Sequence, residues 1–364
     1  MENKIIGFII SVYDRLDDLK INLELIQSYK INKHIFVSCP QDAPISKIKE
    51  ICSRYSVTLL SHETISINKK SNVLTNASLS NRVWDTQRFA IKEASRYCDI
   101  VIHTHSDCWL MNFEKFIGIL RIFIANKVSF GFRGVGITKV YFPGAPLGSI
   151  DDHFMIFNST LVRNSNFLDK EYKELFPGIL NIHGIWSLFL YTEIGTKNYL
   201  HYDNGQNWFS WDNKKVDHLR GNPLRPYVYN KNLSIIHCHI SDFPRNTGKN
   251  LQANLLLKHK LKGEFINEFI EKYKNKNVEK ELIQYRKKLK LKLLYRFETN
   301  KFHNNLNYME IACNSNMSFK ILFNNLMRSL FRLIFPKGYR LKNENKIYPL
   351  DYKEFYIKNK LSEI

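Results

Sequence analysis

Paired cysteines are missing from this sequence of 364 residues. The six cysteines are scattered along the chain, with no C-x-x-C pair and no close spacing among them. Close spacing is what a disulfide framework or a cysteine-rich zinc site requires, so the sequence argues against both. The pattern predicts a protein of a reducing compartment, which points to the cytoplasm.

Long apolar runs are missing as well. The run from Ile5 to Val12 is too short to span a bilayer, and no small-residue cleavage site follows it. A second apolar stretch, 319–335, is interrupted by polar residues, namely Lys320, Asn324, Asn325, Arg328 and Arg332. We therefore expect no transmembrane helix and a cytoplasmic location.

Acidic residues are scarce relative to basic ones. The chain has 54 Lys and Arg against 34 Asp and Glu, a net charge of +20. Residues 1–250 carry a net +7 and residues 251–364 a net +13, so most of the excess lies in the last third. A basic segment attracts polyanions such as nucleic acid, an anionic membrane surface or a charged glycan or nucleotide.

The first part of the chain alternates between two hydrophobic patterns. Continuous apolar runs indicate strands that are buried on both faces, and stretches with helical periodicity lie between them. This alternation predicts an α/β fold with a mainly parallel sheet flanked by helices. The expected strands are 4–12, 34–39, 57–60, 99–105 and 154–158, with a last one at 233–240, and the expected helices are 16–29, 45–55, 78–97 and 112–127.

The pattern loosens after residue 128 and changes again near residue 250. Residues 128–250 are rich in Gly, Pro and aromatic side chains, a composition typical of loops that shape a binding face. Segments 254–297 and 318–335 are helical in pattern and basic. We predict a catalytic domain over 1–250 and a basic helical C-terminal region over 251–364. The apolar stripe and basic flanks of 318–335 suit an anionic membrane surface, although packing or oligomerisation is an alternative.

The segment from Asp99 to Trp109 carries the clearest chemistry. A predicted buried strand ends there at His105-Ser106-Asp107. Open α/β sheets bind ligands at the carboxyl ends of their strands, and residues two apart on a strand point the same way. His105 and Asp107 could therefore hold a divalent cation or a phosphate-bearing ligand.

This segment and the helix before it resemble the GT-A glycosyltransferases of the bacterial family 2 type. Residues 86–94 read TQRFAIKEA, similar to A-R-N-x-A-I-x-x-A, and residues 99–107 read DIVIHTHSD, similar to D-Y-I-x-F-L-D-S-D. Residues 11–15 (SVYDR), with Leu19, resemble the opening turn of that family. The resemblance implies a GT-A (Rossmann-like) fold and a nucleotide-sugar donor. The donor-binding residues that it implies are Ser11, Val12, Asp14, Arg15, Asp42, Arg88, His105 and Asp107.

The same resemblance implies a divalent cation. Asp107 matches the second carboxylate of the D-x-D motif, His105 replaces the first, and His239 corresponds to a late histidine ligand. Carboxylates suit Mg²⁺ or Mn²⁺, and an imidazole shifts the preference toward Mn²⁺. An imidazolium at residue 105 could instead stabilise the diphosphate directly, which leaves metal independence open.

The general base is ambiguous from the sequence. The family's acidic pair at a helix start is absent around residues 181–186. Asp152, Glu193 and His183 are the three candidates. We expect a single displacement with inversion, assisted by one of these groups.

These observations favour a transferase that moves a sugar from a nucleotide-diphosphate donor to a growing surface glycan, such as lipopolysaccharide or capsule. The expected partners are the donor, a glycan or glycolipid acceptor and the inner face of an anionic membrane, with no nucleic acid. One alternative is a nucleic-acid-binding protein that uses the basic tail. Another is a catalytically inactive glycan-binding member of the same fold, because the D-x-D and acidic-pair motifs are both degraded.

Overall fold

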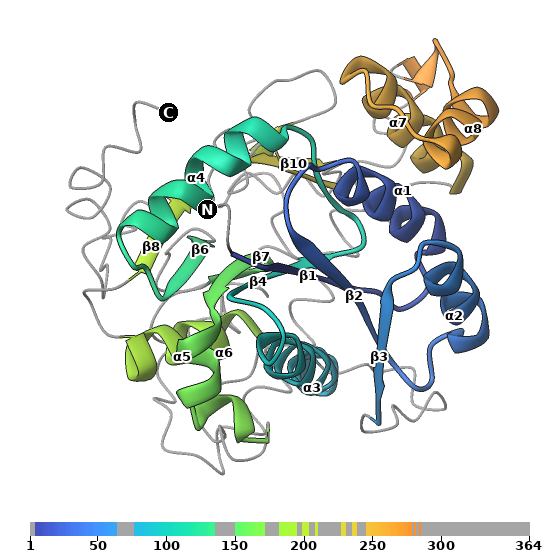
Figure 1. Cartoon of the computed structure of the whole chain (residues 1–364). Coiled ribbons are helices and arrows are strands. Elements are labelled where there is room, and N and C mark those ends of the chain that lie inside the picture. Colours follow the sequence, from blue (N-terminus) through green and yellow to red (C-terminus); the bar gives the residue numbers. More distant parts are fainter. Residues whose placement is uncertain are drawn as a thin grey trace, which may run out of the picture.

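We describe the protein from a computed structural model of the whole chain (Figure 1). The structure describes residues 4–63, 76–134, 150–171, 182–194, 199–203, 208–209, 227–230, 235–238, 245–278, 280–281 and 284. Two predicted features, the metal ligand His239 and the helix 318–335, lie outside these residues.

Within the described residues, seven strands form the main sheet, in the order β3-β2-β1-β4-β7-β6-β8. The pairs β1–β2, β2–β3, β1–β4 and β6–β8 are parallel, and β7 runs antiparallel to both β4 and β6. The predicted α/β fold with a mainly parallel sheet is confirmed. The strands are β1 (Ile6–Ser11), β2 (Lys33–Pro40), β3 (Thr58–His62), β4 (Ile100–His105), β6 (Phe130–Gly134), β7 (Ile150–Asn158) and β8 (Tyr199–Asp203).

Helices cover both faces of this sheet, as Figure 1 shows. The helices α1, α2 and α4 pack on one face, and α3, α5 and α6 pack on the other. A helix on each face buries the central strands completely, which explains why they are apolar without alternation. Their bounds are α1 (Leu16–Gln27), α2 (Ile45–Arg54), α3 (Asn76–Ser95), α4 (Phe113–Ala125), α5 (Ser159–Asn164) and α6 (Ile182–Phe189).

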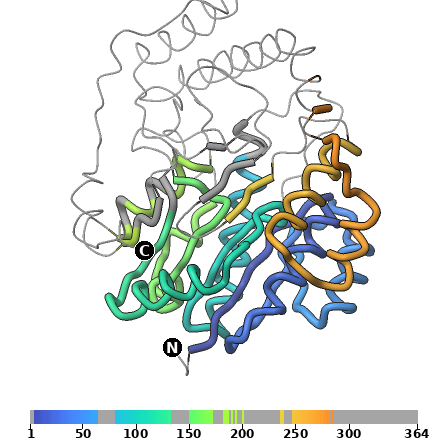
Figure 2. Tube along the Cα trace, turned by 90° about the horizontal axis from the view of Figure 1, so that it is seen from above, coloured from blue at the N-terminus to red at the C-terminus, as the bar shows by residue number. Residues whose placement is uncertain are grey.

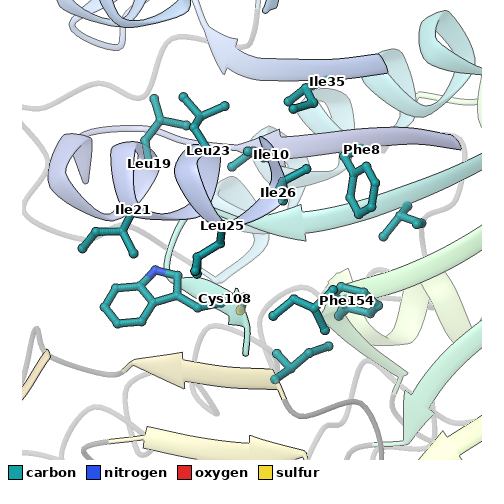
Figure 3. Packing of buried hydrophobic residues seen from close by; sticks show 14 of the residues in the cluster. Phe8, Ile10, Leu19, Ile21, Leu23, Leu25, Ile26, Ile35, Cys108 and Phe154 are labelled. Atoms are coloured by element: carbon teal, nitrogen blue, oxygen red, sulfur yellow. The ribbon is translucent and has the colours of Figure 1, made fainter. Parts of the chain in front are cut away.

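Strand β1 shows how one apolar run serves two cores. Phe8 and Ile10 belong to the core under α1, which Figure 3 shows from close by. Ile9 points the other way, into the core that contains Trp84 of α3 and Trp186 of α6. All five side chains are at most 1% exposed. Burial on both faces fixes the register of β1 in the sheet, and therefore the position of the residues that follow it.

A second, smaller sheet lies at the end of β4. Its strand order is β5-β11-β10-β9, and every pair is antiparallel. The strands are β5 (Cys108–Leu110), β9 (Trp208–Phe209), β10 (Tyr227–Asn230) and β11 (Ile235–Cys238). Strand β5 was not predicted, because a strand of three residues is too short to show a hydrophobic period.

Two C-terminal helices pack against α1 (Figure 2). These are α7 (Arg245–Lys258) and α8 (Glu264–Tyr273), so the helical segment expected from residue 254 is broken, with Lys260 at a φ of 55° between them. Gln252 donates a hydrogen bond to Asp18, and Leu256 and Ile266 join the core that contains Phe8. The predicted domain boundary at residue 250 stays a prediction for the whole chain, but α7 crosses that position.

Glu24 of α1 caps α8. Its carboxylate accepts hydrogen bonds from the backbone N–H groups of Phe265 and Ile266, at 2.7 and 2.9 Å. A Cβ at Gly263 would lie 2.1 Å from Glu24 Oε2 and 3.2 Å from Glu24 Cβ. Only glycine leaves room for the cap at this position.

We expect Gly263→Ala to lower the free energy of unfolding by about 1–2 kcal/mol, because the new methyl group displaces the capping carboxylate. Urea unfolding of the full chain measures this. In a Glu24→Ala background the cap is already gone, so Gly263→Ala should then cost clearly less. An equal cost in both backgrounds would contradict the capping role.

Two sequence-level expectations concern membranes and cysteines. Among the described residues, no helix is both long and apolar enough to cross a membrane. Five cysteines fall in the same part of the chain, at positions 39, 52, 98, 108 and 238, and all are free thiols and buried. Within the described residues the cysteines therefore serve packing and form no disulfide.

Candidate functional site

Part of the predicted site set, namely Arg15, His105, Asp107, Asp152 and His183, lies together at one edge of the main sheet. Strands β1 and β4 are parallel neighbours, with Ser11 opposite His105, and the Ser106 N–H donates to the Ser11 carbonyl at 2.9 Å. Because β7 is antiparallel to β4, its first residues, including Asp151 and Asp152, lie at the same edge. This edge is the carboxyl end of the parallel strands, where the sequence predicted ligand binding.

Asp107 lies in the turn between β4 and β5 and has two partners. Arg15 Nη1 donates to Asp107 Oδ2, and His237 Nε2 of β11 lies 3.3 Å from the same oxygen. Arg15 also donates to the Cys238 carbonyl, at 3.1 Å. Burial alone would raise the pKa of Asp107, but His237 and Arg15 hold that pKa well below its ordinary value. Asp107 is therefore ionised and compensated by its neighbours.

Asp152 is buried among imidazoles. Its Oδ2 accepts a hydrogen bond from Gln87 Nε2 at 2.9 Å and lies 3.4 Å from His105 Nε2. Its Oδ1 lies 3.4 Å from His183 Nδ1 and 3.7 Å from His153 Nδ1. Burial would raise the pKa of Asp152, but His153 and His105 hold it well below its ordinary value. Asp152 is a stable carboxylate rather than a proton acceptor at neutral pH.

His153 lies between these two carboxylates. Its ring centroid is 3.9 Å from that of His237 and 4.7 Å from that of His105, and its Nδ1 and backbone N–H both contact Asp151 Oδ1. Burial lowers the pKa of His153, but Asp151 and Asp152 outweigh it and raise the pKa to about 9. Burial and the charge of His153 lower the pKa of His237 to about 4. At pH 7 His153 is therefore an imidazolium beside a neutral His237.

Gln87 of α3 has a fixed orientation. The indole N–H of Trp186 donates to Gln87 Oε1 at 2.7 Å, and an indole nitrogen can only donate. The other end of the amide is therefore the NH₂ group. It faces Asp152 Oδ2 at 2.9 Å and His105 Nε2 at 3.2 Å.

Ser11 of β1 and His103 of β4 form a polar contact next to the site. Ser11 Oγ lies 2.8 Å from His103 Nε2, and Val12 is 5% exposed. Burial lowers the pKa of His103 to about 3, so this imidazole is neutral at pH 7. Ser11, Val12 and His103 therefore pack beside the site and hold the ends of β1 and β4 together.

Three predicted donor-binding residues have other surroundings. Asp14 is exposed, and Asp42 forms an ion pair with Arg82. Arg88 bonds Asp85 Oδ1 at 2.8 Å and the carbonyl of Asp169 at 3.2 Å, which ties α3 to the short helix η1 (Phe167–Asp169). The neighbour of Arg88 in sequence, Gln87, is the residue that contacts the Asp152 carboxylate.

The candidate bases separate into two places. His183 contacts Asp152, and its Nδ1 lies 2.8 Å from the Ile150 carbonyl. Glu193, in the π-helical turn η3 (Leu190–Ile194), accepts a hydrogen bond from Ser165 Oγ at 2.9 Å. Ser165 Oγ in turn accepts from the Phe167 N–H, so the described contacts of Glu193 support η1.

The surroundings of Asp107 bear on the predicted cation. Arg15 and His237 both address Asp107 Oδ2, so the guanidinium already supplies positive charge at this carboxylate. A cation there would have to displace Arg15 from that oxygen. His105 instead contacts Asp152, and whether His239 reaches either residue lies outside the described chain.

Sequence reasoning did not assign roles to Gln87, His153 or His237. His153 adjoins the predicted Asp152, and His237 adjoins Cys238, whose carbonyl binds Arg15. These residues reach the site because β7 pairs with β4 and β11 pairs with β5. A single sequence does not reveal such pairings. Proximity in sequence to an assigned residue was the only usable hint.

No family of known proteins matches the sequence, and no curated protein does. Among solved structures, the chain is similar to 4-diphosphocytidyl-2C-methyl-D-erythritol synthase from Anaerococcus prevotii, at 14% identity and a TM-score of 0.36, over 58% of this chain and 92% of that chain. The chain is also similar to a cytidylyltransferase from Leptospira borgpetersenii, at 15% identity and a TM-score of 0.34, over 55% of this chain and 76% of that chain. The similarity to mouse xyloside xylosyltransferase 1, in its apo form, is 11% in identity and 0.32 in TM-score, over 54% of this chain and 84% of that chain. These similarities are too weak to assign a family.

Proposed function

We propose that this protein is a GT-A-type glycosyltransferase, which moves a sugar from a nucleoside-diphosphate donor to a growing surface glycan with inversion. One observation carries the proposal. Strand order reverses between β1 and β4, and the carboxyl ends of these two strands supply Arg15, His105 and Asp107. A reversal of strand order in an open α/β sheet creates the crevice in which nucleotides bind.

The charges at this edge suit the departure of a diphosphate. Arg15 keeps its guanidinium charge at any physiological pH, and His153 is protonated at pH 7 because its pKa is raised to about 9. Donors that are fixed in place before the reaction stabilise the developing negative charge of the leaving group. A Mn²⁺ or Mg²⁺ ion, if bound, would add the same kind of stabilisation as a Lewis acid.

His183 fits the role of general base better than the other candidates. The Ile150 carbonyl can only accept, so His183 Nδ1 carries the hydrogen and Nε2 is the basic nitrogen. Asp152, at 3.4 Å, orients the ring and would stabilise its protonated form. Asp152 itself has a pKa too low for efficient proton transfer, and Glu193 is engaged by Ser165.

Release of nucleoside diphosphate from a panel of UDP-, GDP-, ADP- and CDP-linked sugars tests the proposal. We expect the full chain to release diphosphate from at least one donor. His183→Gln should reduce the rate by about 100-fold or more, because it removes the base, and Glu193→Gln should change it little. No release from any donor, with or without Mn²⁺, would oppose a catalytic role and favour the inactive glycan-binding alternative.

The proposals for the acceptor and for the membrane location of the reaction are based on the sequence. The net +13 of residues 251–364 fits a glycan carried on a lipid at an anionic membrane surface. Binding of the full chain to vesicles with and without anionic lipid would test this. Salt-dependent binding of RNA, with no binding of donor, would favour the nucleic-acid alternative.

A further inference from the structure

Gln87 of α3 completes a closed chain of contacts that begins and ends on α6. The indole N–H of Trp186 donates to Gln87 Oε1 at 2.7 Å, and Gln87 Nε2 donates to Asp152 Oδ2 at 2.9 Å. The other oxygen of Asp152, Oδ1, lies 3.4 Å from His183 Nδ1. His183 and Trp186 are three residues apart on α6, so they lie on the same side of that helix. The contacts therefore join α3, α6 and β7 at the candidate base.

The direction of each hydrogen bond in this chain is determined. An indole nitrogen can only donate and an ionised carboxylate can only accept, so Gln87 must accept from Trp186 and donate to Asp152. The side chains of Gln87, Trp186 and Asp152 are all at most 3% exposed. Solvent therefore has little access to them, and a donor removed from Gln87 would leave the Asp152 oxygen without a replacement.

The bond from Gln87 restricts the Asp152 carboxylate. Rotation about the last torsion of an aspartate is soft, and it exchanges the positions of the two oxygens. The bond to Oδ2 opposes this rotation and keeps Oδ1 toward His183. The same helix, α3, also carries Ser80, whose Oγ accepts from the Ile182 N–H at 3.2 Å at the start of α6. Helix α3 thus fixes both the carboxylate beside His183 and the helix that carries His183.

We propose that Gln87 is a positioning residue of the candidate site: it directs Asp152 Oδ1 at His183 and so holds the imidazole where Nε2 can take the proton of the acceptor hydroxyl. The inference rests on the proposed role of His183 as the base. Gln87 is 0% exposed, so it acts through Asp152 and does not touch the substrate. Loss of its donor should therefore lower kcat more than it changes KM for the sugar donor.

Two substitutions separate positioning from packing. Gln87→Met has a similar length but no donor, and we expect kcat to fall about tenfold or more at every pH, with KM changed less than about twofold. Gln87→Glu can donate to Asp152 only while the introduced carboxyl is protonated, and burial beside Asp152 raises the pKa of that carboxyl. The rate of Gln87→Glu should therefore be close to normal near pH 6 and should fall about tenfold near pH 9, relative to the unaltered protein at each pH.

Gln27→Met is the matched control. The Gln27 amide donates to the Tyr55 carbonyl at 2.6 Å, at the end of α1, so the same chemical change removes a hydrogen bond outside the site. We expect this variant to keep its rate within about twofold at each pH. The melting temperature of each variant shows whether it is folded. If Gln87→Met does not fold, the pH profile of Gln87→Glu decides, since a packing role would not produce a new pH dependence.

A second readout needs neither sugar donor nor activity. The ring nitrogens of His183 are followed by NMR in full chains with ¹⁵N-labelled histidine, and are assigned by their loss in His183→Gln. We expect these resonances to move in Gln87→Met and to stay in place in Gln27→Met. Unmoved His183 resonances in folded Gln87→Met, or a pH profile of Gln87→Glu identical to that of the unaltered chain, would overturn the proposal. Absence of donor turnover in the unaltered chain, with the His183 resonances moved, would oppose the transferase function and support the contact from Gln87 to His183.

Discussion

Asp107→Asn is expected to lower the rate of donor turnover by about 100-fold or more. The carboxylate holds Arg15 through one oxygen, and His237 lies 3.3 Å from that oxygen. An amide oxygen can take the place of Asp107 Oδ2, but it carries no negative charge to hold the Arg15 guanidinium. Arg15 would then lose the orientation that directs it to the diphosphate.

The measurement is kcat/KM for diphosphate release, together with the melting temperature of each variant. Asp169→Asn makes the same chemical change at a surface pair with Lys92 and should leave the rate within about twofold. Arg15→Lys keeps the charge but not the planar group, and we expect an intermediate loss. A rate for Asp107→Asn within threefold of the unaltered protein, in a folded variant, would remove Asp107 from the site.

The second large effect concerns stability and pH. Asp18 of α1 is 4% exposed and accepts a hydrogen bond from Gln252 of α7. Burial, and then the nearby Asp107 carboxylate, raise the pKa of Asp18 to about 8 in the folded protein. The unfolded chain has an ordinary carboxyl there, so it releases its proton near pH 4.

The sign follows from this difference. Between about pH 4 and pH 8 the folded state keeps a proton that the unfolded state has lost, so the free energy of unfolding falls as pH rises. The stabilisation is complete below pH 4 and is lost by pH 8, and the change is on the order of 5 kcal/mol for one group shifted this far.

Asp18→Asn mimics the protonated side chain and should remove this dependence. Urea unfolding at pH 5 and pH 8 should therefore show the variant gaining stability relative to the unaltered protein as pH rises. Asp17→Asn, one residue away and paired with Lys249 near the surface, is the matched control. The same change with pH in Asp18→Asn and in the unaltered chain would show that Asp18 is not protonated when folded.

The central strands and helices could be predicted because their residues are committed to burial. The continuous run of Ile and Val in β1 and β4 indicates strands covered on both faces, and the structure has them there. The end of β4 could likewise be identified as a binding edge, with His105 and Asp107 on it. The local sequence pattern is enough to predict a feature that depends on a single strand or helix.

The partners of these residues could not be predicted. Asp152 meets His105 because β7 returns antiparallel to β4, and His237 meets Asp107 because β11 pairs with β5. Both pairings join segments that are far apart in the chain, and β5 is too short to show a period. Arg88 is an example: it was assigned from its motif, but Gln87, one residue earlier, is the residue that contacts the Asp152 carboxylate.

The placement of charge along the chain also changes in meaning. The sequence assigned the basic excess to a separate C-terminal region, but α7 and α8 pack on α1 through Lys249, Gln252 and the cap at Glu24. Asp18 and Arg15 lie on or beside the same helix, three residues apart. Packing of α7 therefore bears directly on the helix that begins beside Arg15.

Calorimetric titration of the full chain with nucleoside diphosphates is the most direct test of the central claim, that this sheet edge binds a nucleotide-linked donor. We predict that at least one of UDP, GDP, ADP and CDP binds with micromolar affinity, and that Arg15→Gln weakens it at least tenfold. The corresponding nucleoside, which lacks the diphosphate, should bind far more weakly. If none of the four binds, or if binding is indifferent to Arg15→Gln, the claim is contradicted.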